Sequence, residues 1–387
     1  MHDARVRRVI SALCALATIS GCGDDPVRIV GGACAFGDEH RIAIPEGPVV
    51  HDVALASDGT RAWAVWSDPS GAFAREIDGT GVPIAAPVRL GAPCDAGVAA
   101  ATLAGAPWIA CGRRGDDARS DEGGVQVLEL RDGRVSARAS FGPVGPDGEG
   151  VALDVAGTPR VGWQEARGAI SAAWVAELRE GARPERISPP RFRASRPALA
   201  TRADGTPLVA WSETWLDARG DVEGRIELRA GTAAARAVAD LAFDDPHPTL
   251  RGSGDDLVLA FRDRRPARSR PRVQIARVTG EPGLDRIESA SHANAIGDAP
   301  AIPCGDHVYV VAPRTHSRTE RLVSVRRYTR ALEPAGPEQQ IYEHGSAFEH
   351  GDAQCVGGHL LIVIGGRPSP VHEHGTIRAV QVSCDAP

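Results

Sequence analysis

Residues 196–213 read RPALATRADGTPLVAWSE, and residues 51–68 read HDVALASDGTRAWAVWSD. Residues 150–165, GVALDVAGTPRVGWQE, follow the same pattern. Each stretch has a short apolar run, a turn that contains glycine, a second apolar run ending in tryptophan, and an acidic residue two positions later. Two short apolar runs joined by such a turn are typical of a β-hairpin. A hairpin that recurs along one chain indicates a repeat architecture.

Four more diverged copies begin at Val98, Pro248, Pro300 and Asp352. The turn glycines recur about every 50 residues, a spacing that belongs to propeller-type repeats. They are Gly59, Gly105, Gly157, Gly205, Gly254, Gly305 and Gly357. Two further strand-like runs follow each hairpin, as at 225–228 and 237–241. No stretch shows a sustained helical period. Four strands per repeat predict an all-β, seven-bladed β-propeller over residues 39–387.

The two ends of this ring are predicted to meet in one blade. Residues 376–383 align with the third strand of a repeat, and no fourth strand follows them. Residues 39–45, EHRIAIP, are similar to the fourth-strand segment ERISP at 185–189. We therefore expect the N-terminal strand to complete the last blade and to remove the open sheet edges.

Composition excludes several classes of protein. The chain has 387 residues, with 44 basic residues against 50 acidic ones and a net charge of -6. Every basic residue is arginine, because the sequence contains no lysine. A slightly acidic chain without a basic domain argues against a nucleic-acid binder. The 42% of hydrophobic residues is sufficient for a large core, so the chain is not disordered.

The N-terminal segment has the features of an export signal. Arg5, Arg7 and Arg8 precede an apolar stretch at 9–20 that is too short to span a bilayer. The stretch ends Ile19-Ser20-Gly21-Cys22. This order resembles the lipobox of bacterial lipoproteins. The resemblance implies cleavage before Cys22, a diacylglycerol on its sulfur, and acylation of the new amino group by a fatty acid such as palmitate.

This resemblance sets the expected domain organisation and location. Residues 1–21 are the lipoprotein signal peptide, and residues 22–38 are the lipidated cysteine and a tether. Several acyl chains anchor a protein stably, so we expect an exported, extracytoplasmic protein held on the bacterial outer membrane. An ordinary signal peptide with an incidental cysteine is the alternative.

Removal of the signal peptide and lipidation of Cys22 leave six other cysteines in the mature chain. An even number in an oxidising compartment predicts three disulfides. The expected closure of the ring brings Cys34 near Cys384. Cys94 and Cys111 flank the first hairpin of the second blade, and Cys304 and Cys355 lie near equivalent turns of neighbouring blades. We predict these three pairs.

The repeat register selects candidates for a ligand-binding rim. The first set of candidates stands two positions after the tryptophan position of each repeat, or close to that place in the last repeat. These residues are Asp68, Arg113, Glu165, Glu213, Asp263, Arg314 and Arg367. The residues that lead into the first strands include His51, Asp52, Asp95, Glu149, Arg196, His247, Asp298, His350 and Asp352. Solvated loop ends, or acid–arginine pairs between blades, are the simpler interpretation. Trp66, Trp163 and Trp211 are expected in the core between blades rather than in a sugar platform.

Histidines near the last repeat suggest a metal site. His372 and His374 are two positions apart, which puts both imidazoles on one side of a strand. His350 leads into the first strand of the same blade. Neutral imidazole suits zinc, so these three residues are the candidate ligands of a zinc cofactor. Solvated loop histidines without any cofactor are the alternative.

The hairpins that combine Asp-Gly with a later Val and Trp resemble repeats of sialidase-like and BNR-like bacterial surface propellers. The family's Asp-box is not matched, since Ser57-Asp58-Gly59-Thr60 has the residue types at the wrong spacing. The resemblance implies three arginines for a carboxylate, for which Arg113, Arg314 and Arg367 are available. It also implies a tyrosine nucleophile paired with a glutamate. Tyr309, Tyr328 and Tyr342 all fall within strand patterns, so no catalytic set is carried over.

Two functions remain open at this stage. The first is a monomeric scaffold that binds a protein or glycan partner. Because its basic residues are all arginines, an anionic partner is favoured. The alternative is a carbohydrate-active hydrolase or lyase that uses Glu165, Glu213 and Asp263. No phosphate-binding loop, dinucleotide fingerprint or nucleophile elbow occurs in the sequence.

Overall fold

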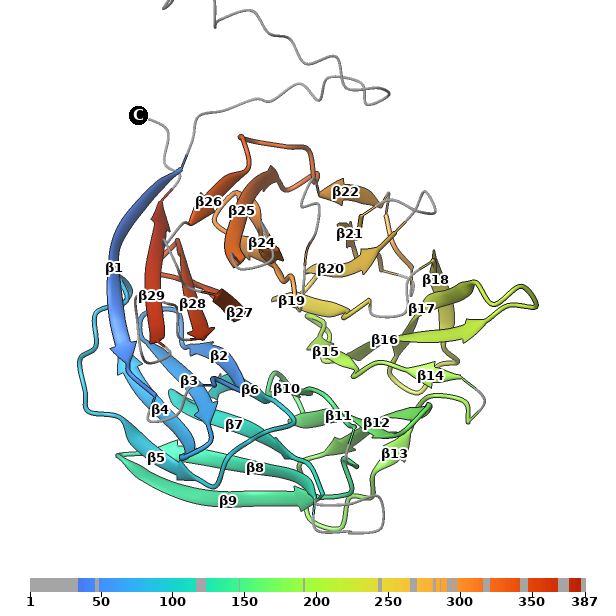
Figure 1. Cartoon of the computed structure of the whole chain (residues 1–387), viewed down its shortest axis with the longest axis horizontal. Coiled ribbons are helices and arrows are strands. Elements are labelled where there is room, and N and C mark those ends of the chain that lie inside the picture. Colours follow the sequence, from blue (N-terminus) through green and yellow to red (C-terminus); the bar gives the residue numbers. More distant parts are fainter. Residues whose placement is uncertain are drawn as a thin grey trace, which may run out of the picture.

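The computed structural model describes residues 34–45, 49–115, 123–145, 147–190, 192–242, 246–264, 270–280, 283–285, 287–290, 295, 298–315, 321–341, 347–367 and 376–383. Within these residues 29 β-strands form seven antiparallel blades around one axis (Figure 1). The prediction of an all-β, seven-bladed propeller is confirmed. No helix that could cross a membrane is found in this part of the chain.

The first three blades follow the predicted repeats, with strands numbered from the axis outward. Blade 1 contains β2 (Asp52–Ser57), β3 (Ala62–Asp68), β4 (Gly71–Ile77) and β5 (Val88–Gly91). Blade 2 contains β6 (Val98–Leu103), β7 (Ala106–Arg113), β8 (Gly124–Arg131) and β9 (Arg134–Phe141). Blade 3 contains β10 (Val151–Asp154), β11 (Arg160–Arg167), β12 (Ile170–Glu177) and β13 (Glu185–Arg186).

The innermost strand of blade 4 is interrupted. Its two parts, β14 (Arg193–Ala194) and β15 (Ala198–Thr201), both pair with β16 (Pro207–Leu216), which is followed by β17 (Val222–Ala230) and β18 (Arg236–Leu241). Blade 5 contains β19 (Thr249–Ser253), β20 (Asp256–Asp263), β21 (Arg272–Arg277) and β22 (Glu288–Ala290). Blade 6 contains β23 (Ala301–Cys304), β24 (His307–Thr315), β25 (Arg321–Thr329) and β26 (Gln339–Ile341). Blade 7 contains β27 (Ala347–Val356), β28 (His359–Arg367), β29 (Thr376–Ser383) and β1 (Ala35–Ala43).

The hairpins repeat because their turns require glycine. All seven predicted turn glycines have positive φ, from 55° at Gly305 to 93° at Gly59. Residues with a Cβ adopt this left-handed region only at a cost in energy. The tryptophans of the hairpins are core residues, as expected: Trp163 and Trp211 are both 1% exposed.

The N-terminal strand completes the last blade, as predicted. β1 pairs antiparallel with β29, from Ala35 opposite Ser383 to Ala43 opposite Ile377, and lies along the outside of blade 7 (Figure 1). Ile42 is fully buried in an apolar cluster that contains residues of blade 1 and blade 7. The first described strand thereby joins the start of the ring to its end.

Two of the predicted disulfides are confirmed. Cys94 is bonded to Cys111, and Cys304 is bonded to Cys355 in the neighbouring blade. Cys34 also takes part in a disulfide. Its predicted partner, Cys384, lies outside the described residues, and that pairing stays a prediction. These bonds indicate an oxidising, extracytoplasmic environment. Cys22 and the rest of residues 1–33 also lie outside the described part.

Ring closure by β1 is testable with two isoleucines of the same segment. Replacing buried Ile42 with alanine is expected to lower the free energy of unfolding by about 2–5 kcal/mol, because the cavity opens between blades 7 and 1. Ile44 is 52% exposed, so Ile44→Ala should change it by about 0.5 kcal/mol or less. Urea denaturation of both variants checks this. Equal losses would contradict the closure.

Candidate ligand site

One polar cavity of about 520 Å³ opens at the end of the channel where the first strands of the blades begin. We call this cavity the cup. Each of the seven blades contributes to it, mainly through the residues that precede or open its innermost strand. The ionisable side chains of the cup are His51, Asp52, Asp95, Arg114, Asp147, Glu149, Arg193, Arg196, His247, Asp298 and His350.

A ring position of the innermost strands determines the shape of the cup. In the second strand, Trp66 and Trp163 hold equivalent positions, and Cys111 holds that position in blade 2. Val53, Val98 and Val151 of the innermost strands pair with these three residues. The ring position is the residue immediately before each valine. This position is therefore Asp52 in blade 1, Gly97 in blade 2 and Gly150 in blade 3. It is Arg196 in blade 4, within the interruption between β14 and β15. Two neighbouring glycines thus stand beside one long cationic side chain.

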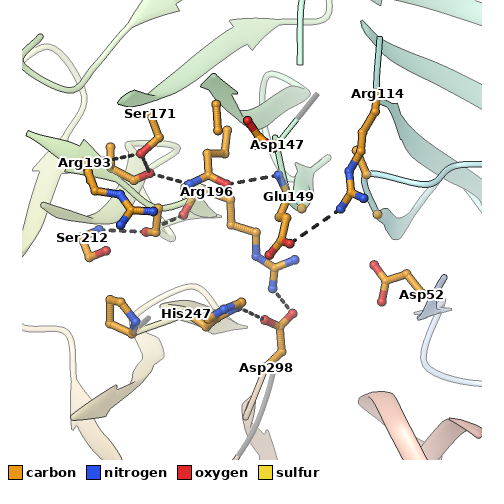
Figure 2. A pocket seen from close by; sticks show the side chains of 18 of the residues that line it. Asp52, Arg114, Asp147, Glu149, Ser171, Arg193, Arg196, Ser212, His247 and Asp298 are labelled. Carbon is orange, nitrogen blue, oxygen red and sulfur yellow. Dashed lines mark hydrogen bonds and ion pairs between the residues drawn. The ribbon is translucent and has the colours of Figure 1, made fainter. Parts of the chain in front are cut away.

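The glycine of blade 3 makes room for that side chain. A Cβ on Gly150, which has a φ of +76°, would lie 2.2 Å from Cδ of Arg196. Only a residue without a side chain lets the arginine pass at this point. Figure 2 shows the Arg196 guanidinium extending toward Asp298, with Glu149 above it.

Arg196 connects blade 4 with blade 6 across the channel. Its guanidinium forms an ion pair with Asp298, and the other carboxylate oxygen of Asp298 lies 3.1 Å from Nδ1 of His247 in blade 5. Burial lowers the pKa of Arg196, and the carboxylates of Asp52, Asp352 and Glu149 oppose that effect. Arginine keeps its charge even so, which makes this pair a fixed cross-channel contact.

Asp52 connects blades 1, 2 and 7. Its carboxylate accepts hydrogen bonds from the amides of Val53 and Val98, both at 2.9 Å, and lies 3.5 Å from Nδ1 of His350. Burial alone would raise the pKa of Asp52. The hydrogen bond and charge of His350, the Val98 amide and the charge of Arg196 outweigh burial and lower this pKa. Asp52 is therefore ionised at neutral pH.

A second cross-channel pair lies below the first. Arg251 of blade 5 contacts Asp352 of blade 7 at 2.9 Å, and Asp352 also accepts the Leu55 amide of blade 1 at 3.0 Å. The channel around these side chains has a volume of only about 50 Å³. The cup is consequently closed at its base by ion pairs.

The wall next to blade 2 keeps one histidine neutral. Burial lowers the pKa of His51, as do the charges of Arg114 and His350, while Asp95 and Asp68 oppose them. Arg114 is held in place by the carbonyl of Gly148, which accepts from its Nε at 3.1 Å. A neutral imidazole both donates and accepts hydrogen bonds.

Of the residues predicted to lead into the first strands, all but Asp352 line the cup, and Asp352 lies in the channel below it. The described side chains two positions after the tryptophan do not line it. Glu213 is 1% exposed, accepts from Nε1 of Trp211 at 3.0 Å and contacts Arg225 at 2.9 Å. Glu165 accepts from Nε1 of Trp174 at 2.9 Å.

Four other candidates of that set, Asp68, Arg113, Asp263 and Arg314, do not line the cup either. Asp263 accepts from the Ala242 amide at 2.9 Å, and Arg314 pairs with Glu338. Asp68 is buried and accepts from the hydroxyl of Ser70 in its own hairpin at 2.5 Å. Arg113 is exposed at the end of β7, and the side chain of Arg367 lies outside the described part.

The two-residue period of a strand explains why these candidates do not line the cup. A residue two positions after a tryptophan points to the same face of the blade. That face packs against the preceding blade, as the apolar clusters around Trp66, Trp163 and Trp211 show. The acid is therefore placed between two blades, where it bonds mostly to side chains of its own blade. Sequence reasoning also missed Arg114, Asp147 and Arg193, which lie in loops or in the short β14 and share no repeat position.

The predicted zinc site is only partly described. His350 lines the cup beside Asp52, while His372 and His374 lie outside the described residues. Among the residues that the structure does describe, no three histidine, cysteine or acidic side chains are grouped as metal ligands. The zinc site stays a prediction.

Replacing Gly150 tests how the cup is built. Gly181 has a φ of +75° with open space at its Cβ, and Gly150 has nearly the same φ beside Arg196. Gly181→Ala should lower the free energy of unfolding by about 1–2 kcal/mol through backbone strain alone. Gly150→Ala should lower it by about 1–3 kcal/mol more, because Arg196 must move. Urea denaturation measures both, and equal losses would show that the close contact is unimportant.

Comparisons with known proteins support the fold and no more. No family model matches the chain, and no curated protein matches it. A protein of unknown function from Dyadobacter fermentans has a TM-score of 0.54 at 10% identity, over 91% of this chain and 99% of its own. The polysaccharide lyase Uly1 has a TM-score of 0.51 at 8% identity, over 89% and 92%. A subtype N11 neuraminidase-like protein of A/flat-faced bat/Peru/033/2010 has a TM-score of 0.46 at 10% identity, over 93% and 98%. At these identities the likeness shows the propeller fold alone.

Proposed function

We propose that this protein is an exported, lipid-anchored propeller that binds a carboxylate-bearing glycan in the cup. The observation that carries the proposal is the convergence of polar side chains from all seven blades on one cavity. A volume of about 520 Å³ suits a saccharide unit or two better than a folded protein surface. Binding, rather than catalysis, was also the first expectation from the sequence.

The lining of the cup suits hydroxyl groups. Besides its charged residues, the cup contains Gln164, Ser171, Ser195 and Ser212. The polar atoms of Gln164, Ser171 and Ser195 already bond within the protein. Neutral His51, whose ring both donates and accepts, is therefore the group of the cup that is suited to a sugar hydroxyl. Sugars present many hydroxyls that need both kinds of partner when they leave water.

The cup holds five acids against three arginines, so the case for an acidic ligand rests on which charged groups already have a partner. Each of its acids already has a donor. Asp52 has His350 and two amides, and Asp298 has Arg196 and His247. Asp95 and Asp147 accept from the amides of Arg114 and Gly168, and the carboxylate of Glu149 lies 3.6 Å from the guanidinium of Arg114.

Arg193 differs from these groups. Its exposed side chain lines the cup and has no ion-pair or hydrogen-bond partner within the described residues. Figure 2 shows it on the side of Arg196 opposite Arg114. A guanidinium binds a carboxylate through two parallel hydrogen bonds. Arg193 is therefore a charged group of the cup that remains open to a ligand, and it suits a carboxylate such as that of a uronate.

The glycan proposal is testable by calorimetry with oligogalacturonate and its carboxyl-reduced, neutral form. We expect the acidic oligosaccharide to bind at least about tenfold more tightly, because a charge-assisted hydrogen bond contributes about 1.5–3 kcal/mol. Arg193→Ala should abolish that preference. Arg236, an exposed arginine outside the cup, provides the control variant Arg236→Ala.

Two results would contradict this proposal. One is the absence of saturable binding by an array of uronate and sialate glycans; the other is an unchanged preference in Arg193→Ala. Release of shortened or unsaturated products during the same incubations would instead support the hydrolase or lyase. Such an enzyme would have to use carboxylates of the cup, since Glu165, Glu213 and Asp263 do not line it.

The position of β1 supports the anchoring part of the proposal. The first strand of each blade begins at the cup, and successive strands alternate in direction. β1 is the fourth strand of blade 7, so it begins at the opposite face of the ring. A lipid on Cys22 would hold that face toward the membrane and leave the cup facing away from it.

Anchoring is testable by detergent partitioning. The full-length chain expressed in a bacterial host should enter the detergent phase of Triton X-114, because acylated Cys22 carries long apolar chains. Cys22→Ser should stay in the aqueous phase. If the unaltered chain also stays in the aqueous phase, the lipoprotein assignment is wrong.

A further inference from the structure

A second cavity, of about 530 Å³, lies between blade 7 and blade 1. It is formed by the last residues of β1, the β3–β4 hairpin and β5. We call it the seam pocket. It is separate from the cup, and no residue lines both cavities. Nothing in the proposed glycan site uses it.

The seam pocket has an aromatic base and an apolar wall. Phe73 is half-buried, and its ring is stacked on that of Trp66 with centroids 5.5 Å apart and planes inclined by 19°. Ile44, also in the lining, is 52% exposed. A flat ring placed against Phe73 and Ile44 would cover apolar surface that now faces water.

The charges of the seam pocket are not balanced. Arg41, Arg75 and Arg89 all line it, and none of the three forms an ion pair within the described residues. Two of them donate to backbone carbonyls, which carry no net charge. Nε of Arg75 donates to Ala85 at 2.7 Å, and Nη2 of Arg89 donates to Ser70 at 2.8 Å.

One acid lines the seam pocket, and it is already satisfied. Asp68 is 1% exposed and accepts from the amide of Ser70 at 2.7 Å and from its hydroxyl at 2.5 Å. The pocket therefore has a net positive charge next to an aromatic surface. In the cup, by contrast, five acids stand against three arginines, and no phenylalanine, tyrosine or tryptophan is among the lining residues.

We propose that the seam pocket binds a flat aromatic anion. Its ring stacks on Phe73, and its carboxylate or similar group is held by the exposed guanidinium groups of Arg41 and Arg89. Both ends of the ring closure contribute to the pocket, because Arg41 belongs to β1 and the other two residues to blade 1. An occupant consequently also stabilises the contact between blades 7 and 1.

The test uses 2-naphthoate as the probe and 2-naphthalenemethanol as its neutral counterpart. By calorimetry, 2-naphthoate should bind at one saturable site, with an affinity at least tenfold higher than that of the alcohol. The double variant Arg41→Ala, Arg89→Ala should lose this difference. The matched control Arg134→Ala, Arg236→Ala removes two exposed arginines outside both cavities and should bind like the unaltered protein.

Phe73→Leu tests the stacking part, because leucine keeps the site apolar without a ring. It should weaken both probes several-fold. Thermal melting without a probe verifies that each variant is folded, and 2-naphthoate should raise the melting temperature of the unaltered protein. Binding that does not saturate, equal affinity for acid and alcohol, or undiminished binding by the Arg41, Arg89 variant would overturn the proposal.

Discussion

The pairing of β1 with β29 is the contact on which the rest of the ring depends. Six blades are built from consecutive strands, but blade 7 takes three strands from one end of the described chain and one from the other. Without β1, β29 would present an unpaired edge and blade 7 would lack its outer strand. The apolar cluster around Ile42 would also lose its cover between blades 7 and 1. Long-range closure therefore fixes the relative positions of all the residues that converge on the axis.

Two ion pairs cross the centre of the ring among apolar residues of the innermost strands. Arg196 and Arg251 each reach across the channel to an acid two blades away, at Asp298 and Asp352. Such buried pairs contribute little net stability, since each ion loses its hydration. They do define which side chains stand at the base of the cup. Polar neighbours of this kind give a site its shape before any ligand arrives.

Much of the fold could be predicted from the sequence because the determining signals are local and repeated. Glycine recurs at each of the seven hairpin turns, and tryptophan stands near the end of the second strand in three of them. The similarity of 39–45 to a fourth strand indicated the closure. Disulfides followed from that arrangement, since Cys94 and Cys111 lie symmetrically about one hairpin.

The candidate site was less predictable for a physical reason. Both Asp52 and Asp68 belong to blade 1, yet only Asp52 lines the cup, because the two lie on different strands with different facing directions. The register of the repeats predicts where a strand begins, which identified Arg196 and Asp298. It does not predict the break between β14 and β15 that admits Arg196, nor the position of Arg193. Those depend on contacts between blades.

The antiparallel alignment of β1 with β29 has a mechanical consequence. A pull on residue 34 acts along the strand axis. The part of that force that the Cys34 disulfide does not carry stretches the backbone hydrogen bonds between β1 and β29 in shear, so that they resist together. A pull across the strands would break them one after another. In a chain held by its N-terminal end, tension therefore enters the ring at its closing strand in the direction in which that strand is hardest to remove.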